Sequence, residues 1–475
     1  MFWPRTSPEA SSNSTTARQT RLRPKLSRRV ACGISRAISV SMLGFVLFAI
    51  LGGIFQRARF YADVQHRQAA GDKVLIADFV TAPPPDNQNA ATYIRQAIDQ
   101  IRLNPHQEWL IDDVGTYRLS TEAKSFIIQY YKVHPQIRAL LQKAKACPTA
   151  DWHIKWRTPA IDIDGSYLKG QREFALFLFA VGISQHEAGD DAAAIQTAQD
   201  IFFLARAVDT RSTFVGHLVA DGMERLGASL CLRLAEPTTP PTVRQDLYDM
   251  ALPVISDQSD DVRFRRQFDS AIRVDRMGSL DLTIHLPTSK FAMFCFQYPI
   301  FSGAHAVLKD YDGPIAAAAS PSWPTTATQV PVERPRSGPF LAQIMEPALW
   351  GSFLVEYKTT AERHAATITI ASRLYADDHD GTWPADLSAL VPHYLPAIPY
   401  DPFDVHLQPM KYQPSNPPAI YSISTNGIDN HGDRTGAVSY KYGFNYDPWQ
   451  SPDAVFPIGG VVEPAEKRSA ENADQ

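Results

Sequence analysis

Three polar side chains between residues 214 and 234 could share one chemical role. His217, Asp221 and Glu224 are spaced i, i+4 and i+7, which places them on one face of an α-helix. An imidazole beside two carboxylates can bind a metal ion or transfer protons. The segment has no His-Glu-x-x-His pattern, so the arrangement typical of zinc proteases is absent. We therefore interpret the three residues as a polar helix face that packs on a neighbouring helix.

Other candidate residues give weaker signals for chemistry. The chain has no Gly-x-Ser-x-Gly, no P-loop and no Gly-x-Gly-x-x-Gly that opens a βαβ unit. Trp152 and Trp156, with His153 between them, could line a groove for a sugar or a peptide, although such aromatic residues more often fill a core. The acidic stretches 310–313 and 377–381 are explained by Asp-Gly turns, because neither has the glutamate that ends an EF-hand loop. We predict no catalytic residue and no organic cofactor.

These candidates lie among segments with helical periodicity. Apolar spacing predicts helices over residues 90–103, 120–146, 167–187, 191–208 and 214–234. The second helix should break near His134-Pro135. Helix pairs joined by short Gly-containing turns are typical of a compact or solenoid-like helical domain. Gly189-Asp190 before an Ala-rich helix resembles one tetratricopeptide-type unit, but no second copy follows at a fixed period.

The N-terminal region is typical of a membrane anchor. Residues 37–55 form an uncharged apolar run that is long enough to cross the hydrocarbon core as a helix. Residues 1–36 are strongly basic, with Glu9 as their only acid, so the N-terminus should stay in the cytoplasm and the rest should cross the inner membrane. A cleaved signal peptide would have a shorter apolar core and a small-residue cleavage site. A buried core helix would not explain the basic tail, so we favour a retained anchor.

The chain after this anchor is acidic. Ten of the 46 basic residues and one of the 50 acidic residues lie in the first 60 positions, which leaves 36 basic and 49 acidic residues, a net charge of −13. Such a surface does not suit nucleic acid as a partner. The four cysteines are far apart and form no Cys-x-x-Cys, so neither a zinc ribbon nor a thioredoxin site is supported; one disulfide is compatible but not implied. They are Cys32, Cys147, Cys231 and Cys295.

Residues 340–459 carry an ordered series of motifs. A helical segment to about Tyr375 comes first, and alternation around residues 420–423 indicates a half-buried strand. Between them lie Asp380-Gly381-Thr382-Trp383-Pro384, Leu387, Leu390-Val391 and Ile398-Pro399-Tyr400-Asp401-Pro402. This series resembles the globular part of the major pseudopilin of bacterial type II secretion. The resemblance implies a small α+β module with a long helix and a short antiparallel sheet.

Two features depart from the pseudopilin pattern. Pseudopilins begin with a processed Gly-Phe-Thr-Leu-x-Glu segment fused to their long helix, whereas this chain has Gly33-Ile34-Ser35-Arg36, no glutamate at the fifth position and an anchor far from residue 340. We therefore expect no assembly into a pilus through the N-terminal helix. Ser424 and Asn426 also replace the Gly and Asp of the family's last motif.

The resemblance also implies a calcium site. In that family the loop after the Tyr-Ser strand binds calcium, which needs several oxygen ligands from a flexible loop. Here the ligands would be Asn426, Asp429 and Asp433, with glycines nearby that permit tight turns. The alternative is an ordinary turn, because Asn and Asp favour turns through local hydrogen bonds.

The predicted fold is mainly α, with an N-terminal transmembrane helix, an all-α extracytoplasmic domain and the α+β module. The segments are a basic cytoplasmic tail (1–36), the transmembrane helix (37–55), a helical domain (61–311), a Pro-rich linker (312–339), the pseudopilin-like module (340–459) and a disordered tail (460–475). This layout resembles a group of membrane-anchored bacterial envelope proteins. We expect a binding or assembly role beside other envelope or secretion proteins. The alternatives are an extracytoplasmic hydrolase and a helical groove that binds peptides.

Overall fold

The computed structural model describes most of the chain between residues 28 and 458. The described ranges are 28–101, 121–160, 165–210, 212–235, 244–249, 258–285, 296–329, 340–414, 418–435 and 448–458. The predicted tail 460–475, most of the basic tail and Cys295 lie outside these ranges. Within them, Cys147 and Cys231 are free thiols.

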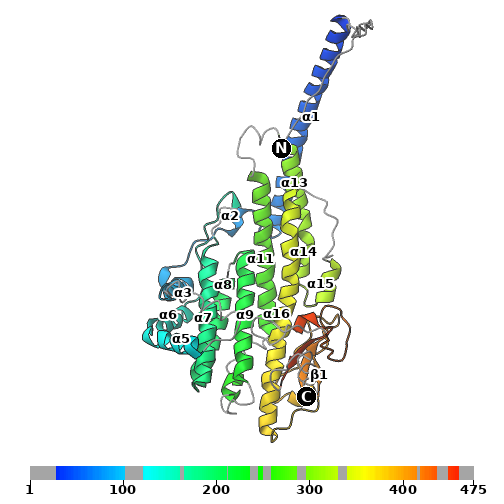
Figure 1. The fold of residues 1–475 in the computed structure, drawn as a ribbon. Coiled ribbons are helices and arrows are strands. Elements are labelled where there is room, and N and C mark those ends of the chain that lie inside the picture. Colours follow the sequence, from blue (N-terminus) through cyan, green and yellow to red (C-terminus); the bar gives the residue numbers. More distant parts are fainter. Residues whose placement is uncertain are drawn as a thin grey trace, which may run out of the picture.

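The first helix, α1 (Arg28–Ala69), is a continuous element that projects far beyond the rest of the molecule (Figure 1). Its part from Ser35 to Ala69 is, among the described helices, the one that is long and apolar enough to cross a membrane. Only 6% of its most apolar 18-residue window is buried. The predicted span 37–55 lies inside this helix, so the structure is compatible with a membrane anchor.

Helices form most of the body, and several have the predicted bounds. The described body helices before the linker include α2 (Ile76–Phe79), η1 (Asp86–Gln88), α3 (Ala90–Asp99), α5 (Thr121–Val133), α6 (Gln136–Lys145), α7 (Tyr167–Glu187), α8 (Asp191–Asp209), α9 (Phe214–Leu234), α11 (Gln258–His285) and α13 (Gln297–Asp310). The break between α5 and α6 at His134-Pro135 confirms that prediction. Asp190 and Thr213 fix the starts of α8 and α9, because each side chain accepts a hydrogen bond from a backbone N–H of the first turn.

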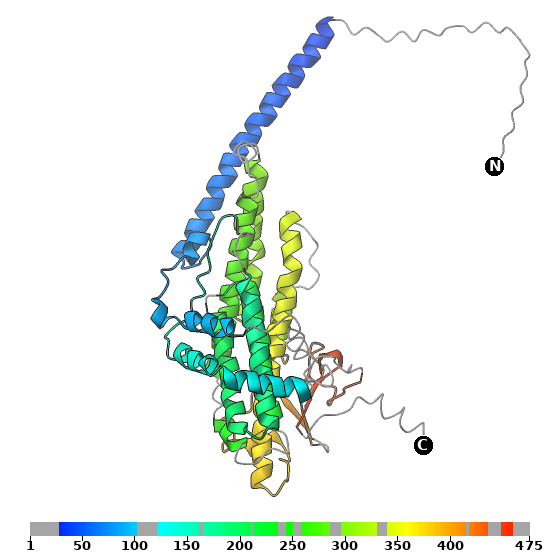
Figure 2. The ribbon, with the colours of Figure 1, turned by 60° about the vertical axis from the view of Figure 1, so that its left-hand side comes forward.

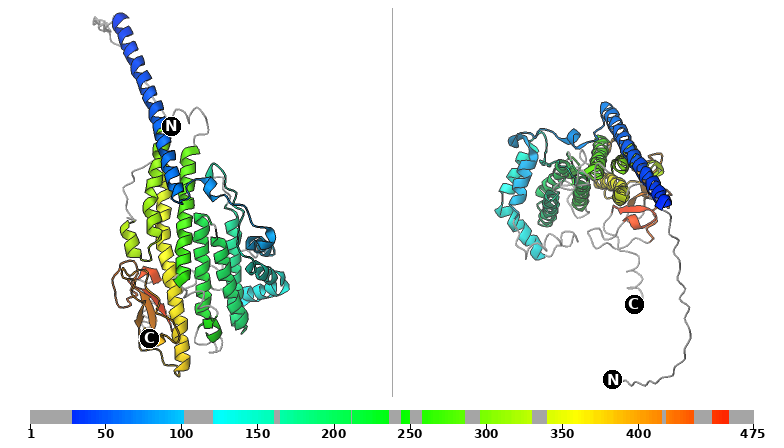
Figure 3. Two further views of the ribbon diagram at one scale, coloured as in Figure 1. Left: turned by 180° about the vertical axis from the view of Figure 1, so that it is seen from behind. Right: turned by 90° about the horizontal axis from the view of Figure 1, so that it is seen from above.

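The central bundle consists of α7, α8, α9, α11 and α16 (Phe340–Asp378), which run side by side (Figures 1 and 2). The shorter helices α3, α5 and α6 cover the side of the bundle formed by α7 and α8. Seen from above, α1 leans over the opposite side of the bundle from α5 and α6 (Figure 3). Helices therefore lie on two opposite sides of the bundle, and residues inside the bundle contact several helices.

The segment 312–339 differs from the predicted linker. It begins with two short helices, α14 (Asp312–Ala318) and α15 (Trp323–Gln329), before residues 330–339, which lie outside the described ranges. Pro314 and Pro324 fit because they occupy first helical turns, where a proline removes no helical hydrogen bond. The Tyr357 hydroxyl of α16 donates to Ser320 O at 2.8 Å and lies 2.6 Å from Thr326 Oγ1. Prolines that suggest a flexible linker are thus compatible with a packed segment.

A small antiparallel sheet packs on the last part of α16, as predicted. Its strands are β1 (Lys411–Gln413), β2 (Ala419–Ser422) and β3 (Ala454–Pro457), in the order β1-β2-β3. Ile420 of β2 lies opposite Tyr412 and Phe456, and both Ile420 and Phe456 join a core with Ile368 and Leu374 of α16. Two single-turn helices, η3 (Leu387–Leu390) and η4 (Pro448–Gln450), complete this region.

One core extends across the predicted domain boundaries. Phe60 of α1, Phe301 of α13 and Phe353 of α16 belong to the same buried cluster as Phe403 and Ile423 near the sheet. One part of α16 therefore packs in the bundle, and the other part packs against the sheet. The described helical and C-terminal regions consequently pack as one body.

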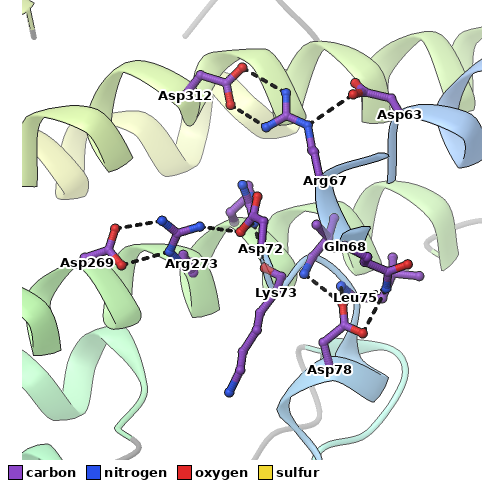
Figure 4. A network of polar contacts seen from close by, with 12 residues as sticks. Asp63, Arg67, Gln68, Asp72, Lys73, Leu75, Asp78, Asp269, Arg273 and Asp312 are labelled. Atoms are coloured by element: carbon purple, nitrogen blue, oxygen red, sulfur yellow. Dashed lines mark hydrogen bonds and ion pairs between the residues drawn. The ribbon is translucent and has the colours of Figure 1, made fainter. Parts of the chain in front are cut away.

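The end of α1 is fixed to the bundle by a polar network (Figure 4). Arg67 makes two hydrogen bonds to the Asp312 carboxylate, at 2.5 and 2.9 Å, and a third to Asp63 at 3.3 Å. Just after the helix, Asp72 pairs with Arg273 and with Arg276, whose Nη2 lies 2.8 Å away. Bidentate Arg–carboxylate pairs define direction as well as distance. The apolar helix therefore has a defined direction relative to the body.

Candidate functional site

A group of titratable side chains lies at the centre of the bundle. The His217 Nδ1 atom of α9 is 2.7 Å from Asp209 Oδ1 at the end of α8. Its Nε2 atom is 3.2 Å from Glu356 Oε2 of α16 and 3.6 Å from Asp221 Oδ1, one turn along α9. The exposed fractions of His217, Asp221 and Glu356 are 0%, 1% and 3%. Four side chains from three helices thus meet around one imidazole.

Local sequence explains how these groups meet. The connection between α8 and α9 is short, so Asp209 and His217 are held on facing helix ends. Phe264 and Phe268 of α11 flank the imidazole, with ring centroids 5.4 and 5.2 Å from it. The aromatic rings exclude water from this side, which strengthens every electrostatic interaction inside the site.

The structure brings together two of the three residues that the sequence analysis placed on one helix face. His217 and Asp221 face each other, whereas Glu224 lies one turn further and pairs with Arg263 at 3.6 Å and with Arg363 at 4.0 Å. Sequence reasoning did not find Asp209 or Glu356. The segment 340–378 carries Glu346, Glu356 and Glu362 among apolar residues, so a buried acid there was a general signal that did not single out Glu356. Asp209 gave no comparable signal, since a helix end accepts any polar residue.

The electrostatics of the cluster favour a bound positive charge. Burial raises the pKa of Asp221 well above its usual value; His217 opposes this shift, and the nearby carboxylates of Glu356 and Asp209 add to it. Burial also raises the pKa of Glu356. Burial alone would lower the pKa of His217, but Asp221 and Asp209 outweigh it and raise this pKa well above its usual value. Three carboxylates around one imidazole therefore need a cation or protons.

A second buried network joins the bundle to the C-terminal region. Asp261 of α11 lies 3.1 Å from His364 Nε2, and its Oδ2 accepts a hydrogen bond from the Tyr400 hydroxyl at 3.1 Å. Arg363 Nη1 is 3.5 Å from Asp261 Oδ1. Burial would raise the pKa of Asp261, but His364 and Arg363 lower it to about 2. The charge of Asp261 is therefore balanced by its basic neighbours, and the network joins α11 to α16 and Tyr400.

A cleft of about 450 Å³ opens between the segment 73–83 that follows α1, the loop 151–156 and α11. Trp156 lies beside Phe79 in this cleft, with ring centroids 5.8 Å apart, and Lys73 Nζ is 5.7 Å from the Phe79 ring. Trp152 is buried at its edge and its Nε1 donates to Ala207 O, so it fills the core. The lining also includes Lys155. The predicted aromatic groove thus corresponds in part to a real cleft.

The loop predicted to bind calcium is organised by local hydrogen bonds. Asn426 Oδ1 accepts from the Ile428 N–H at 2.9 Å, Asp429 Oδ1 from the His431 N–H at 3.0 Å, and Asp433 Oδ1 from the Thr435 N–H at 2.8 Å. These are the contacts of Asx turns, which was the alternative interpretation. In addition, Asp453 accepts from Gly432 N–H at 2.8 Å. Calcium at Asn426, Asp429 and Asp433 stays a prediction.

Comparisons of the chain with known protein families, with curated proteins and with solved structures find no match. The resemblance of residues 340–459 to pseudopilins therefore stays a prediction. The features of the described residues that bear on function are the apolar helix α1, the cleft and the buried cluster.

Proposed function

We propose that this chain is a single-pass envelope protein that is anchored in the inner membrane and binds a ligand or partner outside the cytoplasm. The exposed apolar surface of α1 carries this proposal. Val40, Phe45 and Phe48 are 70%, 73% and 70% exposed on a helix that projects from the body. A continuous apolar surface of this kind is stable when lipid covers it. The basic N-terminal tail favours a cytoplasmic N-terminus.

The cleft beside the end of α1 supports the binding role. Trp156 and Phe79 contribute aromatic surface to the lining, and Lys73 and Lys155 line the same opening. Such a lining suits a ligand that combines an apolar part with a carboxylate or a phosphate. The His217 cluster is enclosed, which favours binding over the hydrolase alternative because a substrate needs access to the reacting groups.

The C-terminal region supports an association with other envelope proteins. A long helix followed by a three-stranded antiparallel sheet agrees with the layout implied by the pseudopilin resemblance. Its partners would then be components of a secretion system, and calcium in the loop 426–433 would stabilise the contact surface.

The binding role is tested by purification of the full chain from detergent-solubilised envelopes. Trp156→Ala removes an aromatic wall of the cleft, and we expect it to abolish the recovery of molecules that copurify with the original chain. Trp383→Ala is the matched control, since Trp383 is a partly exposed aromatic residue outside the cleft, in the turn after α16. Equal recovery with Trp156→Ala and the original chain would contradict a role of the cleft. A parallel purification with a calcium chelator tests the loop.

A further inference from the structure

We propose that His217, Asp221 and Glu356 bind one divalent transition-metal ion inside the bundle, with Asp209 as the carboxylate that orients the imidazole. Among the described residues, these three form a group whose ligand atoms all lie within 4.8 Å of one another. The site is separate from the cleft, and its metal would hold helices together. The inference is independent of the proposed binding role.

The spacing of the ligand atoms fits a single small metal ion. Two ligand atoms at about 2.1 Å from a tetrahedral centre are about 3.4 Å apart. His217 Nε2 lies 3.2 Å from Glu356 Oε2 and 3.6 Å from Asp221 Oδ1. Both separations are within a few tenths of an ångström of the expected value. The Asp221 and Glu356 ligand atoms lie within 4.8 Å of each other, so an ion can be accommodated if these side chains move closer together.

Asp209 gives the imidazole the orientation that a metal ligand needs. Metal-binding histidines usually donate their second ring N–H to a carboxylate or a carbonyl. Asp209 Oδ1 is 2.7 Å from His217 Nδ1 and accepts this hydrogen bond. The Nε2 lone pair of the neutral ring then points at the Asp221 and Glu356 carboxylates. Lone pairs that face carboxylate oxygens repel each other unless a cation or a proton lies between them.

The carboxylates also present free ligand atoms. Neither oxygen of Asp221 has a hydrogen-bond partner among the described residues, and neither does Glu356 Oε1. Asp221 is fully enclosed, so water does not replace the missing partners at the surface. A buried carboxylate without a partner is strongly unfavourable. A metal ion between Asp221 and Glu356 removes this cost.

Charge and donor type indicate which ion fits. Glu224 is paired with Arg263 and Arg363, so it does not need the metal's charge. The three carboxylates that remain around His217 are matched by a dication together with the positive charge of Arg265, which acts on Glu356. One imidazole nitrogen with carboxylate oxygens suits zinc or manganese better than calcium, which prefers six to eight oxygens.

Metal analysis of the full chain in detergent tests this proposal. We expect about one zinc or manganese ion per chain after purification or after reconstitution with the metal alone. Asp221→Asn and Glu356→Gln should each remove it, and Asp209→Asn should weaken binding about tenfold or more. The matched control is Glu362→Gln, which changes a buried carboxylate of the same helix α16 that pairs with Arg225 instead.

A second measurement uses the original chain, so its outcome does not depend on whether the variants fold. Cobalt added to the original chain should give the visible absorption of a nitrogen- and oxygen-ligated ion, and zinc should displace it. Absence of metal, of cobalt absorption and of any zinc-dependent rise in melting temperature would overturn the proposal, and the cluster would then hold a protonated imidazole. Retention of the metal by the Asp221→Asn, Glu356→Gln double variant would also overturn it, because the ion would lie elsewhere.

Discussion

At the scale of single residues, the body contains buried charges that differ in how completely they are balanced. Asp261 accepts hydrogen bonds from His364 and Tyr400 and faces Arg363, so its carboxylate stays ionised although it is buried. Asp221 has no hydrogen-bond partner among the residues that the structure describes. Their pKa values accordingly shift in opposite directions. The first arrangement supports the fold by itself, whereas the second needs a proton or an additional cation.

Replacement of Asp261 by asparagine should destabilise the fold. The pKa of Asp261 falls from 3.8 to about 2 in the folded chain, so its charge contributes about 2 kcal/mol above pH 4. Because the folded pKa is the lower one, this contribution is complete above the unfolded value and is lost as the pH falls towards 2. Urea unfolding at pH 7 should show a lower free energy of unfolding for Asp261→Asn. The difference in this free energy between the variant and the original chain should become smaller below pH 4.

The exposed Asp380 is the control for this change. It follows α16 with a positive φ of 54°, which asparagine also tolerates, so Asp380→Asn should leave the unfolding free energy nearly unchanged. Equal stability of Asp261→Asn and the original chain at pH 7 would show that the His364 and Arg363 contacts do not stabilise the folded state.

At the scale of the elements, α8 and α9 approach each other closely at a glycine. A Cβ atom added at Gly227 would lie 2.7 Å from the Phe202 ring, and one at Gly182 would lie 2.5 Å from Leu230 Cδ2. The backbones of α7, α8 and α9 can therefore lie close together, which holds Asp209 against His217. The small residues are part of what positions the site.

Gly227→Ala should weaken the contact between α8 and α9. The added methyl group overlaps a rigid aromatic ring, and overpacking of this kind costs about 1–3 kcal/mol. Gly222→Ala is a control on the same helix, because an added Cβ meets nothing there and should stabilise an exposed helical position by about 0.5–1 kcal/mol. Urea unfolding of both variants measures the difference. A stabilising Gly227→Ala would show that α8 and α9 do not pack closely at this glycine.

The elements also show how far sequence reasoning reaches. Apolar periodicity and caps are local, and they predict α7 and α9 at their observed bounds. The face shared by His217 and Asp221 follows from the same periodicity. Glu356 lies far away in sequence, and its contact with His217 depends on how α16 packs, which no local pattern specifies. The prolines of residues 312–329 suggested a linker, but the segment contains two short helices, because proline is accepted in the first turn of a helix as well as in linkers.

At the scale of the whole molecule, the proposed topology places the apolar helix across the membrane, the N-terminal tail in the cytoplasm and the body outside it. Protease added to intact spheroplasts should digest the body and leave a protected N-terminal fragment of about the length of the tail and anchor. A tag at each end, detected by immunoblotting, measures this: the N-terminal tag should survive and the C-terminal tag should disappear. A C-terminal tag that survives until lysis would reverse the topology.

The contacts between α1 and the body have a consequence if α1 is held in a bilayer, as we propose. At Gly53, Gln297 of α13 approaches so closely that no side chain fits between them, and Arg67 is clamped to Asp312. The helix from residue 55 to 69 rises about 20 Å, and the cleft begins at Lys73. In an anchored chain, these contacts would fix the height of the cleft opening above the lipid. Molecules at that height could then reach the cleft, and a tilt of the anchor would turn the body with it.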